Sequence, residues 1–331
     1  MTIDRSFLVW AARTALAGRG TTFVARIALG LLVASLAGCG ADFDSPAQLS
    51  KLRLLALQAA PVNPAAGETT TLTPLVYSPS DAPLEFAWSW CPLLGQANDG
   101  YVCPISRDAA DAMLAAAGAT APLPAFDLGA GPTAAFTNPF SPAALAAACA
   151  GGLDGQVVDC NGGFPIRVSV RIAQGAETQQ GTTVVRLPIT AGAVSNTNPM
   201  PGALSVDLPS GTQALDDAGT VRVPRLQDSL LHVAVDDGQA ETYAVTGAGG
   251  QPTTSRETLL FSWFAELSGL DNHRTLFIDG VNTLDGAAAD KWKPPATRDD
   301  GRQTSRLFVV VRDDRGGVGW TSATASLEAT P

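Results

Sequence analysis

Apolar and polar residues alternate along much of the chain from about residue 50 onward, and this pattern predicts β-strands. The clearest case is LEFAWSWC, Leu84 to Cys91, whose Leu84, Phe86 and Trp88 fall on one face of an extended strand. A second stretch, LLFSWFA at residues 259–265, places Leu, Phe and Trp in the same order. The two stretches predict equivalent strands in two related domains.

Each of these strands is followed by a matching pair of strand-like segments. FPIRVSVRIA (164–173) corresponds to SRLFVVVRDD (305–314), and GTTVVRLPI (181–189) to GVGWTSATASL (317–327). Gly, Pro, Asn and Ser cluster between the copies. We therefore expect an all-β protein with two domains. The expected boundaries are domain 1 at 50–191, a linker at 192–202 and domain 2 at 203–331.

The first domain is longer than the second between its matched strands. Trp88 precedes Ile166 by 78 residues, whereas Trp263 precedes Leu307 by 44, an excess of 34 residues. This predicts an insertion at about residues 91–163. It holds two expected helices, at 106–118 and 141–151, each beginning at a serine suited to an N-cap and ending at a glycine.

The insertion also holds four of the five cysteines. An even number of cysteines in an exported chain predicts two disulfides, and three pairings are open. Two short loops are the simplest pairing. A zinc site is the alternative, but neither cysteine pair has the usual ligand spacing and no histidine is near in sequence. The four residues are Cys91, Cys103, Cys149 and Cys160.

A disulfide-stapled insertion in a compact domain has two interpretations. It forms either a recognition surface or a cover over one sheet with its aromatic residues buried. The candidate partner contacts under the first interpretation are Tyr101, Phe126, Phe136 and Phe140.

The first 39 residues have the pattern of a bacterial secretory signal followed by a lipidation motif. Arginines precede the apolar run Ile27 to Ala37, which is too short to span a bilayer and ends in LAGC. We expect cleavage after residue 38, fatty acyl chains such as palmitate on Cys39, and a tether at 39–49. Gly40 favours the outer membrane. The expected location is the cell envelope, on its periplasmic side or exposed at the surface.

A Trp on a central strand, followed by a hydrophobic hairpin that ends the domain, resembles immunoglobulin-like sandwiches of the PKD, cadherin and bacterial Ig-like kind. The resemblance covers most of residues 50–330, but Cys91 follows Trp88, so the antibody-type cysteine pair is absent. The layout of lipidation motif, tether and two such domains is also similar to lipoproteins of myxobacteria. It implies two tandem Ig-like β-sandwiches and names no activity.

Charge and motifs narrow the function further. Residues 1–38 hold four Arg and one Asp, so residues 39–331 carry 17 basic and 30 acidic residues. Only three of the basic residues are Lys. This net charge of −13 argues against nucleic-acid binding. No nucleophile elbow, zinc-protease, phosphate-binding or dinucleotide motif occurs. We assign no catalytic residue, because His232 fits a packed strand residue and His273 a solvated turn residue.

Acidic residues recur where the second domain is expected to turn. Oxygen ligands in such loops bind Ca²⁺ in cadherin-like sandwiches, although Asp also favours turns for local reasons. Ordinary turn chemistry is favoured, and no cofactor beyond the covalent lipid is expected. The weak Ca²⁺ candidates are Asp279, Asn282 and Asp285.

Two functions remain open. The favoured one is a non-enzymatic envelope lipoprotein, a structural or binding module for a protein or glycan partner. The alternative is a carboxylate-dependent envelope hydrolase or glycan-processing factor, which needs two acids at a suitable separation in one cleft.

Overall fold

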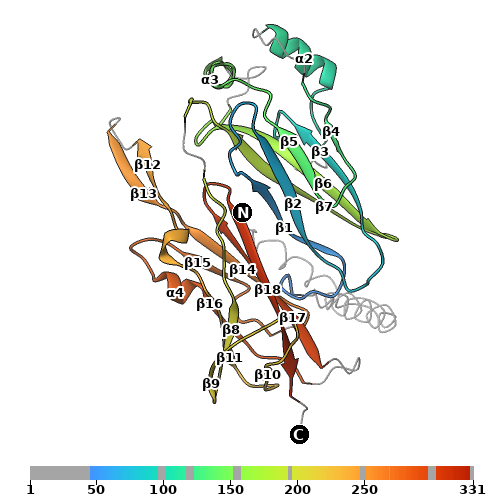
Figure 1. Ribbon diagram of the computed structural model, residues 1–331, viewed down its shortest axis with the longest axis vertical. Helices are drawn as coiled ribbons and strands as arrows, with labels where there is room; N and C mark the ends of the chain where they lie inside the picture. Colours follow the sequence, from blue (N-terminus) through green and yellow to red (C-terminus); the bar gives the residue numbers. More distant parts are fainter. Residues whose placement is uncertain are drawn as a thin grey trace, which may run out of the picture. The chain divides into compact units, whose positions relative to one another are not determined.

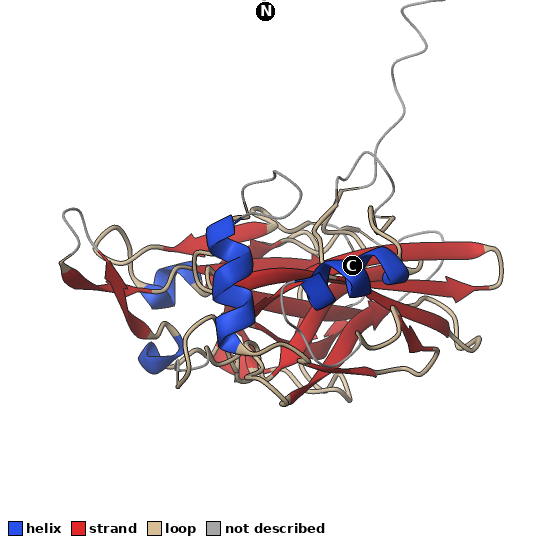
Figure 2. Cartoon of the chain, turned by 90° about the horizontal axis from the view of Figure 1, so that it is seen from above, coloured by secondary structure: helices blue, strands red, loops and turns tan. Residues whose placement is uncertain are grey.

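The structure is a computed structural model that describes residues 45–95, 102–116, 123–151, 158–192, 196–246, 251–267, 269–296 and 303–328. Strands are the main secondary structure of these residues (Figure 2). The described helices are few and short. They are α2 (Arg107–Ala116), α3 (Pro142–Gly151), α4 (Leu284–Ala287) and the 3₁₀ turn η3 (Asp237–Gln239).

The first sandwich consists of two antiparallel sheets (Figure 1). The three-stranded sheet has the order β1 (Arg53–Ala60), β2 (Thr69–Tyr77), β5 (Ala134–Thr137). The four-stranded sheet has the order β4 (Asp127–Gly129), β3 (Glu85–Cys91), β6 (Phe164–Gln174), β7 (Glu177–Leu187).

The second sandwich has the same plan with added strands. One sheet has the order β16 (Ala289–Trp292), β11 (Ser229–Val233), β8 (Leu204–Leu208), β9 (Gly211–Ala214). The other has the order β10 (Arg222–Val223), β18 (Val318–Leu327), β17 (Thr304–Asp313), β14 (Leu259–Ala265), β15 (Arg274–Phe277). A separate hairpin pairs β12 (Thr242–Thr246) with β13 (Pro252–Arg256).

Seven strands recur in the same chain order and the same sheet order in both sandwiches. The series β1, β2, β3, β4, β5, β6, β7 corresponds to β8, β11, β14, β15, β16, β17, β18. These are the A-B-E and C-F-G arrangements of an immunoglobulin-like sandwich, with one extra strand beside C. Trp88 and Trp263 lie on the C strands and are 2% and 1% exposed. The predicted fold class, an all-β protein of two Ig-like sandwiches, is confirmed.

The alternation that identified β3 is also visible in its burial. Trp88 and Trp90 are buried, whereas Ser89 between them is exposed. In β14 this contrast weakens, because Ser262 is buried and Phe264 is half-buried on the face that points away from the second core. Something other than solvent therefore covers the outer face of this sheet.

The cover is the edge of the first sandwich. Leu55, Ala56 and Tyr77 from β1 and β2 form one apolar cluster with Phe308 and Val310 of β17. The rings of Tyr77 and Phe308 meet edge to face, with 6.1 Å between their centroids. Polar contacts surround the cluster, since the Arg312 guanidinium donates to the Leu55 carbonyl at 2.7 Å and Gln58 donates to the Val318 carbonyl at 2.5 Å. The sandwiches are thus joined by a packed interface.

The start of the described chain lies against the second sandwich. Ala265 at the end of β14 donates its backbone N–H to Ala47 and accepts from Leu49, at 3.0 and 2.8 Å. Ala47 and Leu49 are buried, at 3% and 1% exposed. From the sequence, residues 46–49 are predicted to be part of the tether. They precede the first sandwich in sequence but pair with the second, and are here called the strap.

The two helices of the insertion form at the predicted places. Ser106 accepts a hydrogen bond from the Ala109 N–H, and Ser141 accepts one from the Ala144 N–H, as expected for N-caps. The observed bounds, Arg107–Ala116 and Pro142–Gly151, fall within the predicted ranges.

We predict that Gly319→Ala destabilises the joint between linker and second sandwich. A Cβ at Gly319 would lie 1.7 Å from the Pro199 carbonyl oxygen, so linker and strand would have to separate. The free energy of unfolding should fall by about 1–3 kcal/mol, the usual range for overpacking. Urea unfolding followed by tryptophan fluorescence measures it. Gly238→Ala is the control, because nothing lies within 4 Å of its Cβ position; equal effects of the two substitutions would contradict the prediction.

Candidate functional site

The segment from Cys91 to Cys160, here called the cap, is held by two disulfides. It is not one continuous insertion as predicted, because it contains β4 and β5, whose counterparts in the second sandwich are β15 and β16; the added parts are the loops and helices around these strands. Cys91 pairs with Cys103 and Cys149 with Cys160, with Cα atoms 5.6 and 6.0 Å apart. The two disulfides are confirmed, and of the three open pairings the structure has the one with two short loops.

Trp90, the residue of β3 directly before the cap, is the residue around which the cap packs. Its indole contacts three phenylalanine rings, with centroids 5.3 Å from Phe126, 5.0 Å from Phe136 and 6.4 Å from Phe140. Its Nε1 donates to the Ala125 carbonyl at 2.8 Å. In the second sandwich the equivalent position is Ala265, two residues after Trp263. Phe136 of β5, together with Phe126 and Phe140 from the added loops, thus surrounds a Trp that the second sandwich lacks.

This cluster corrects part of the predicted contact surface. Phe136 and Phe140 are only 1% and 7% exposed, so both belong to the hydrophobic core. Phe126 is half-buried and packs against the same core. Their burial follows from Trp90, which needs apolar neighbours on every side that strand β3 does not cover. Tyr101 lies outside the described residues.

The first disulfide loop covers the outer face of the sheet. Cys91 is 1% exposed and lies opposite Arg167 in the β3–β6 pairing. The Arg167 guanidinium, from a nearly buried side chain, donates to the Leu94 carbonyl. The exposed large hydrophobic side chains of the described cap are on this loop: Val102 is 67% and Leu94 is 42% exposed.

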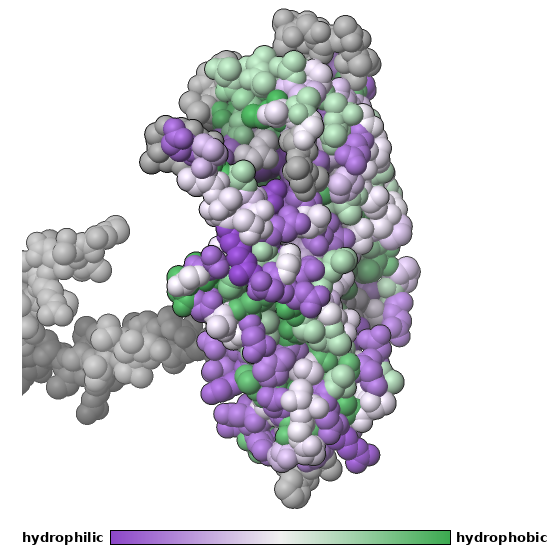
Figure 3. All heavy atoms as spheres, turned by 60° about the vertical axis from the view of Figure 1, so that its left-hand side comes forward, coloured by the Kyte–Doolittle hydropathy of each residue, from purple (hydrophilic) through white to green (hydrophobic). Residues whose placement is uncertain are grey.

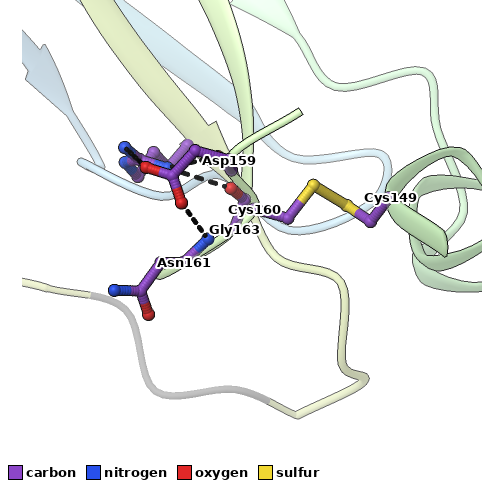
Figure 4. The surroundings of a disulfide bond; sticks show 6 residues. Cys149, Asp159, Cys160, Asn161 and Gly163 are labelled. Atoms are coloured by element: carbon purple, nitrogen blue, oxygen red, sulfur yellow. Dashed lines mark hydrogen bonds and ion pairs between the residues drawn. A yellow bond between two sulfur atoms is a disulfide. The ribbon is translucent and has the colours of Figure 1, made fainter. Parts of the chain in front are cut away.

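The second disulfide fastens α3 to the start of β6. Figure 4 shows the turn that follows Cys160: Asp159 accepts from the Asn161 N–H at 3.0 Å, and Cys160 accepts from the Gly163 N–H at 3.0 Å. Arg186 of β7 bonds the Asp159 carbonyl at 3.1 Å and its carboxylate at 3.4 Å. The helix is therefore anchored to the four-stranded sheet through covalent and polar contacts.

A shallow hollow of about 550 Å³ lies on the A-B-E face of the second sandwich. His232 Nε2 is 3.0 Å from Asp207 across the β8–β11 pairing, and Thr212 donates to Asp207 at 2.5 Å. These hydrogen bonds, Thr212 first, lower the pKa of Asp207. Asp236 and Asp285 also line the hollow. His232 is a strand residue paired with a carboxylate, and His273 is exposed in a turn.

The Ca²⁺ candidates are engaged in local contacts. Asn282 accepts from the Ile278 N–H at 2.9 Å and donates to the Leu276 carbonyl at 2.7 Å. Asp279 faces Arg256 at 3.5 Å, whereas Asp285 lines the hollow. Within the described part of the chain, no group of three or more His, Cys, Asp or Glu has metal-site geometry.

A buried polar cluster, which the sequence analysis missed, lies where linker and second sandwich meet. Arg315 contacts Glu257 at 3.1 Å and Glu241 at 3.3 Å. Asn196 of the linker donates to Asp313 at 3.0 Å. Glu257 is fully buried, and this burial, with the Asp313 charge, raises its pKa to about 7. No motif announces such a cluster, because its members come from four separate segments.

Cys39 and the rest of the signal region lie outside the described residues. Among the helices that the structure describes, none has the length and apolar character needed to cross a bilayer.

No protein-family model and no curated protein matches the chain. Solved structures give weak similarities only. The three N-terminal domains of the bacteriophage RB49 outer capsid protein Hoc are 12% identical with a TM-score of 0.19, over 84% of this chain and 59% of that one. The eight N-terminal Ig domains of DSCAM are 11% identical with a TM-score of 0.19, over 84% of this chain and 25% of that one. Red sea bream transglutaminase is 12% identical with a TM-score of 0.23, over 86% of this chain and 32% of that one. The chain thus spans less than two thirds of these chains, and such scores establish no relationship.

We predict that the buried Glu257 makes the fold less stable as pH rises. Its pKa in the fold is about 7, above the ordinary 4.5, so folding favours the protonated form. The stabilisation is complete below pH 4.5 and is lost as pH rises through 7. Relative to Glu257→Gln, the wild-type free energy of unfolding should fall by up to about 3 kcal/mol between pH 4 and 8.

Urea unfolding at several pH values, with wild type and Glu257→Gln side by side, measures this difference. Asp290, whose burial raises its pKa to about 6, acts in the same direction but is present in both proteins. Parallel stability curves for the two proteins would contradict the prediction.

Proposed function

We propose that the protein is a non-enzymatic cell-envelope lipoprotein whose cap binds a protein or glycan partner. The LAGC motif supports the covalent lipid on Cys39, and two disulfides suit an oxidising compartment outside the cytoplasm. Gly40, which follows Cys39 where an Asp would favour retention in the inner membrane, supports an outer-membrane location.

The observation that carries the binding proposal is the presence of exposed large apolar residues on a cap held by two disulfides. The second sandwich buries Trp263 with no counterpart of the loop closed by Cys91 and Cys103, so an Ig-like core of this kind does not require that loop. The phenylalanines of the cap pack around Trp90 and are not available to a partner. Leu94 and Val102 remain exposed on the loop closed by Cys91 and Cys103. A loop closed by a disulfide loses less conformational entropy on association than an open one, so its exposed apolar residues favour binding.

The hydrolase alternative has one observation in its favour, the hollow lined by Asp207, Asp236 and Asp285. A general acid near neutral pH needs a raised pKa. The pKa of Asp207 is instead lowered, and its carboxylate is engaged by Thr212 and His232. We therefore favour the binding function.

We predict that the double variant Leu94→Ser, Val102→Ser loses partner binding without loss of fold. Both side chains are exposed, so stability should change by less than about 0.5 kcal/mol. A tagged Cys39→Ser protein is used to capture envelope proteins and to probe a glycan array. The matched control is Met200→Ser, which removes an apolar side chain that is 76% exposed in the linker. Full retention of every captured partner by the double variant would overturn the cap proposal.

Lipidation is tested separately in the same cells. Labelled palmitate should enter the wild-type protein and not Cys39→Ser. Incorporation into both proteins, or into neither, would contradict the lipoprotein assignment while leaving the cap test unaffected.

A further inference from the structure

The β12–β13 hairpin, here called the arm, belongs to neither main sheet of the second sandwich. It joins the B strand β11 to the C strand β14, and among the strands that the structure describes it pairs only with itself, over Thr242 to Thr246 and Pro252 to Arg256. Figure 1 draws it in orange, apart from the labelled strands of the two sheets. Two-stranded sheets are marginal in water unless a third strand or a packed face completes them.

The root of the arm is firmly held by two arginines. Arg256 donates to the Asp237 carbonyl at 2.8 Å and to its carboxylate at 2.6 Å, and stacks 5.0 Å over Phe277. Arg315 stacks 4.6 Å over Tyr243 while pairing with Glu241. The arm is therefore fixed in direction at its base.

Beyond the root, the arm lacks a core. Thr242, Ala244, Thr253 and Thr254 are exposed, and none of the arm side chains whose burial the structure describes is buried. The fixed root and the absence of a core leave strand edges that are held in place and open to pairing.

Of the two edges, β12 is the less protected. Sheet edges are usually blocked by charges, by proline or by side chains that occupy the backbone groups. The β13 edge of the arm begins with Pro252, which cannot donate a hydrogen bond. For comparison, at β15, an edge of a main sheet, the Asn282 side chain bonds the Leu276 carbonyl and the N–H of Ile278, the residue after the strand. The segment Thr242 to Thr246, TYAVT, contains no charge and no proline.

The charge at the root indicates which strand would pair there. Asp237 and Asp279 have side chains that are 86% and 58% exposed. Asp236 beside them is exposed, and although it is the N-cap residue of η3, its side chain makes no capping hydrogen bond. This negative edge, in a chain of net charge −10, disfavours a second copy and favours a basic segment. Leu276, Ile278 and Val281 add exposed apolar surface on neighbouring residues, and Figure 3 shows apolar and hydrophilic patches side by side on one face.

We propose that β12 accepts an extended segment of a partner protein as a third strand, with a basic residue beside Asp236. Main-chain hydrogen bonds to β12 supply affinity, and the acidic root sets orientation. This binding surface is on the second sandwich and does not depend on the cap or on lipidation.

The test uses the full-length chain in detergent and the fluorescent peptide KKTVTVTG. Binding is followed by anisotropy, and amide hydrogen exchange locates it. The peptide should bind and slow exchange at Thr242 to Thr246. The same peptide with N-methylated backbone should bind at least about tenfold more weakly, since each lost hydrogen bond removes about 1 kcal/mol. EETVTVTG should also bind more weakly at low salt.

Asp236→Lys tests the acidic root. It reverses a charge that makes no capping contact, and should weaken KKTVTVTG binding about tenfold at low salt and much less at 0.5 M salt. Asp81→Lys, an equal change at an exposed site in the first sandwich, is the control and should leave binding unchanged.

The proposal is overturned if KKTVTVTG does not bind, if its N-methylated form binds equally well, or if exchange slows elsewhere and not in β12. It is also overturned if sedimentation without peptide shows a dimer whose exchange is protected at Thr242 to Thr246, because the occupant would then be a second copy.

Discussion

The burial of tryptophan on the central strand is the constraint on which both sandwiches depend. An indole needs apolar neighbours around its rings and a hydrogen-bond acceptor for its N–H. Trp263 finds its acceptor in the Thr275 hydroxyl of the neighbouring strand, at 3.0 Å. Trp88 instead donates to the Gly131 carbonyl, at 2.8 Å, within the cap. The first sandwich thus completes its core with residues that are not part of the shared strands.

This difference explains why the cap is both an addition and a structural necessity. Its inner side supplies acceptors and rings to Trp88 and Trp90, so removing it would expose two indoles. Its outer side includes the loop closed by Cys91 and Cys103, whose exposed Leu94 and Val102 do not contribute to the packing of these indoles. Core packing and surface chemistry are therefore divided between the two sides of one segment.

Much of the fold could be read from periodicity, because buried strands with one solvent face alternate visibly. The equivalence of Trp88 and Trp263, the helix starts at Ser106 and Ser141 and the short disulfide loops all follow from local rules. The burial of Phe136 and Phe140 could not be predicted from the sequence. Phe136 lies on β5, whose four residues are too few to show a clear alternation, and Phe140 lies in the loop that follows, where no period indicates the direction of a side chain. The Arg315 cluster and the strap also escaped prediction, because each joins segments that are distant in sequence.

The strap has a mechanical consequence. Tension on the N-terminal segment would pass first into the backbone hydrogen bonds of Ala47 and Leu49 with Ala265. Gln48 and Ala265 form a parallel bridge, so a pull along the strap loads these bonds in shear, together and not one at a time. The force enters the second sandwich at strand β14, next to the interface with the first, although the first sandwich follows the strap directly along the chain.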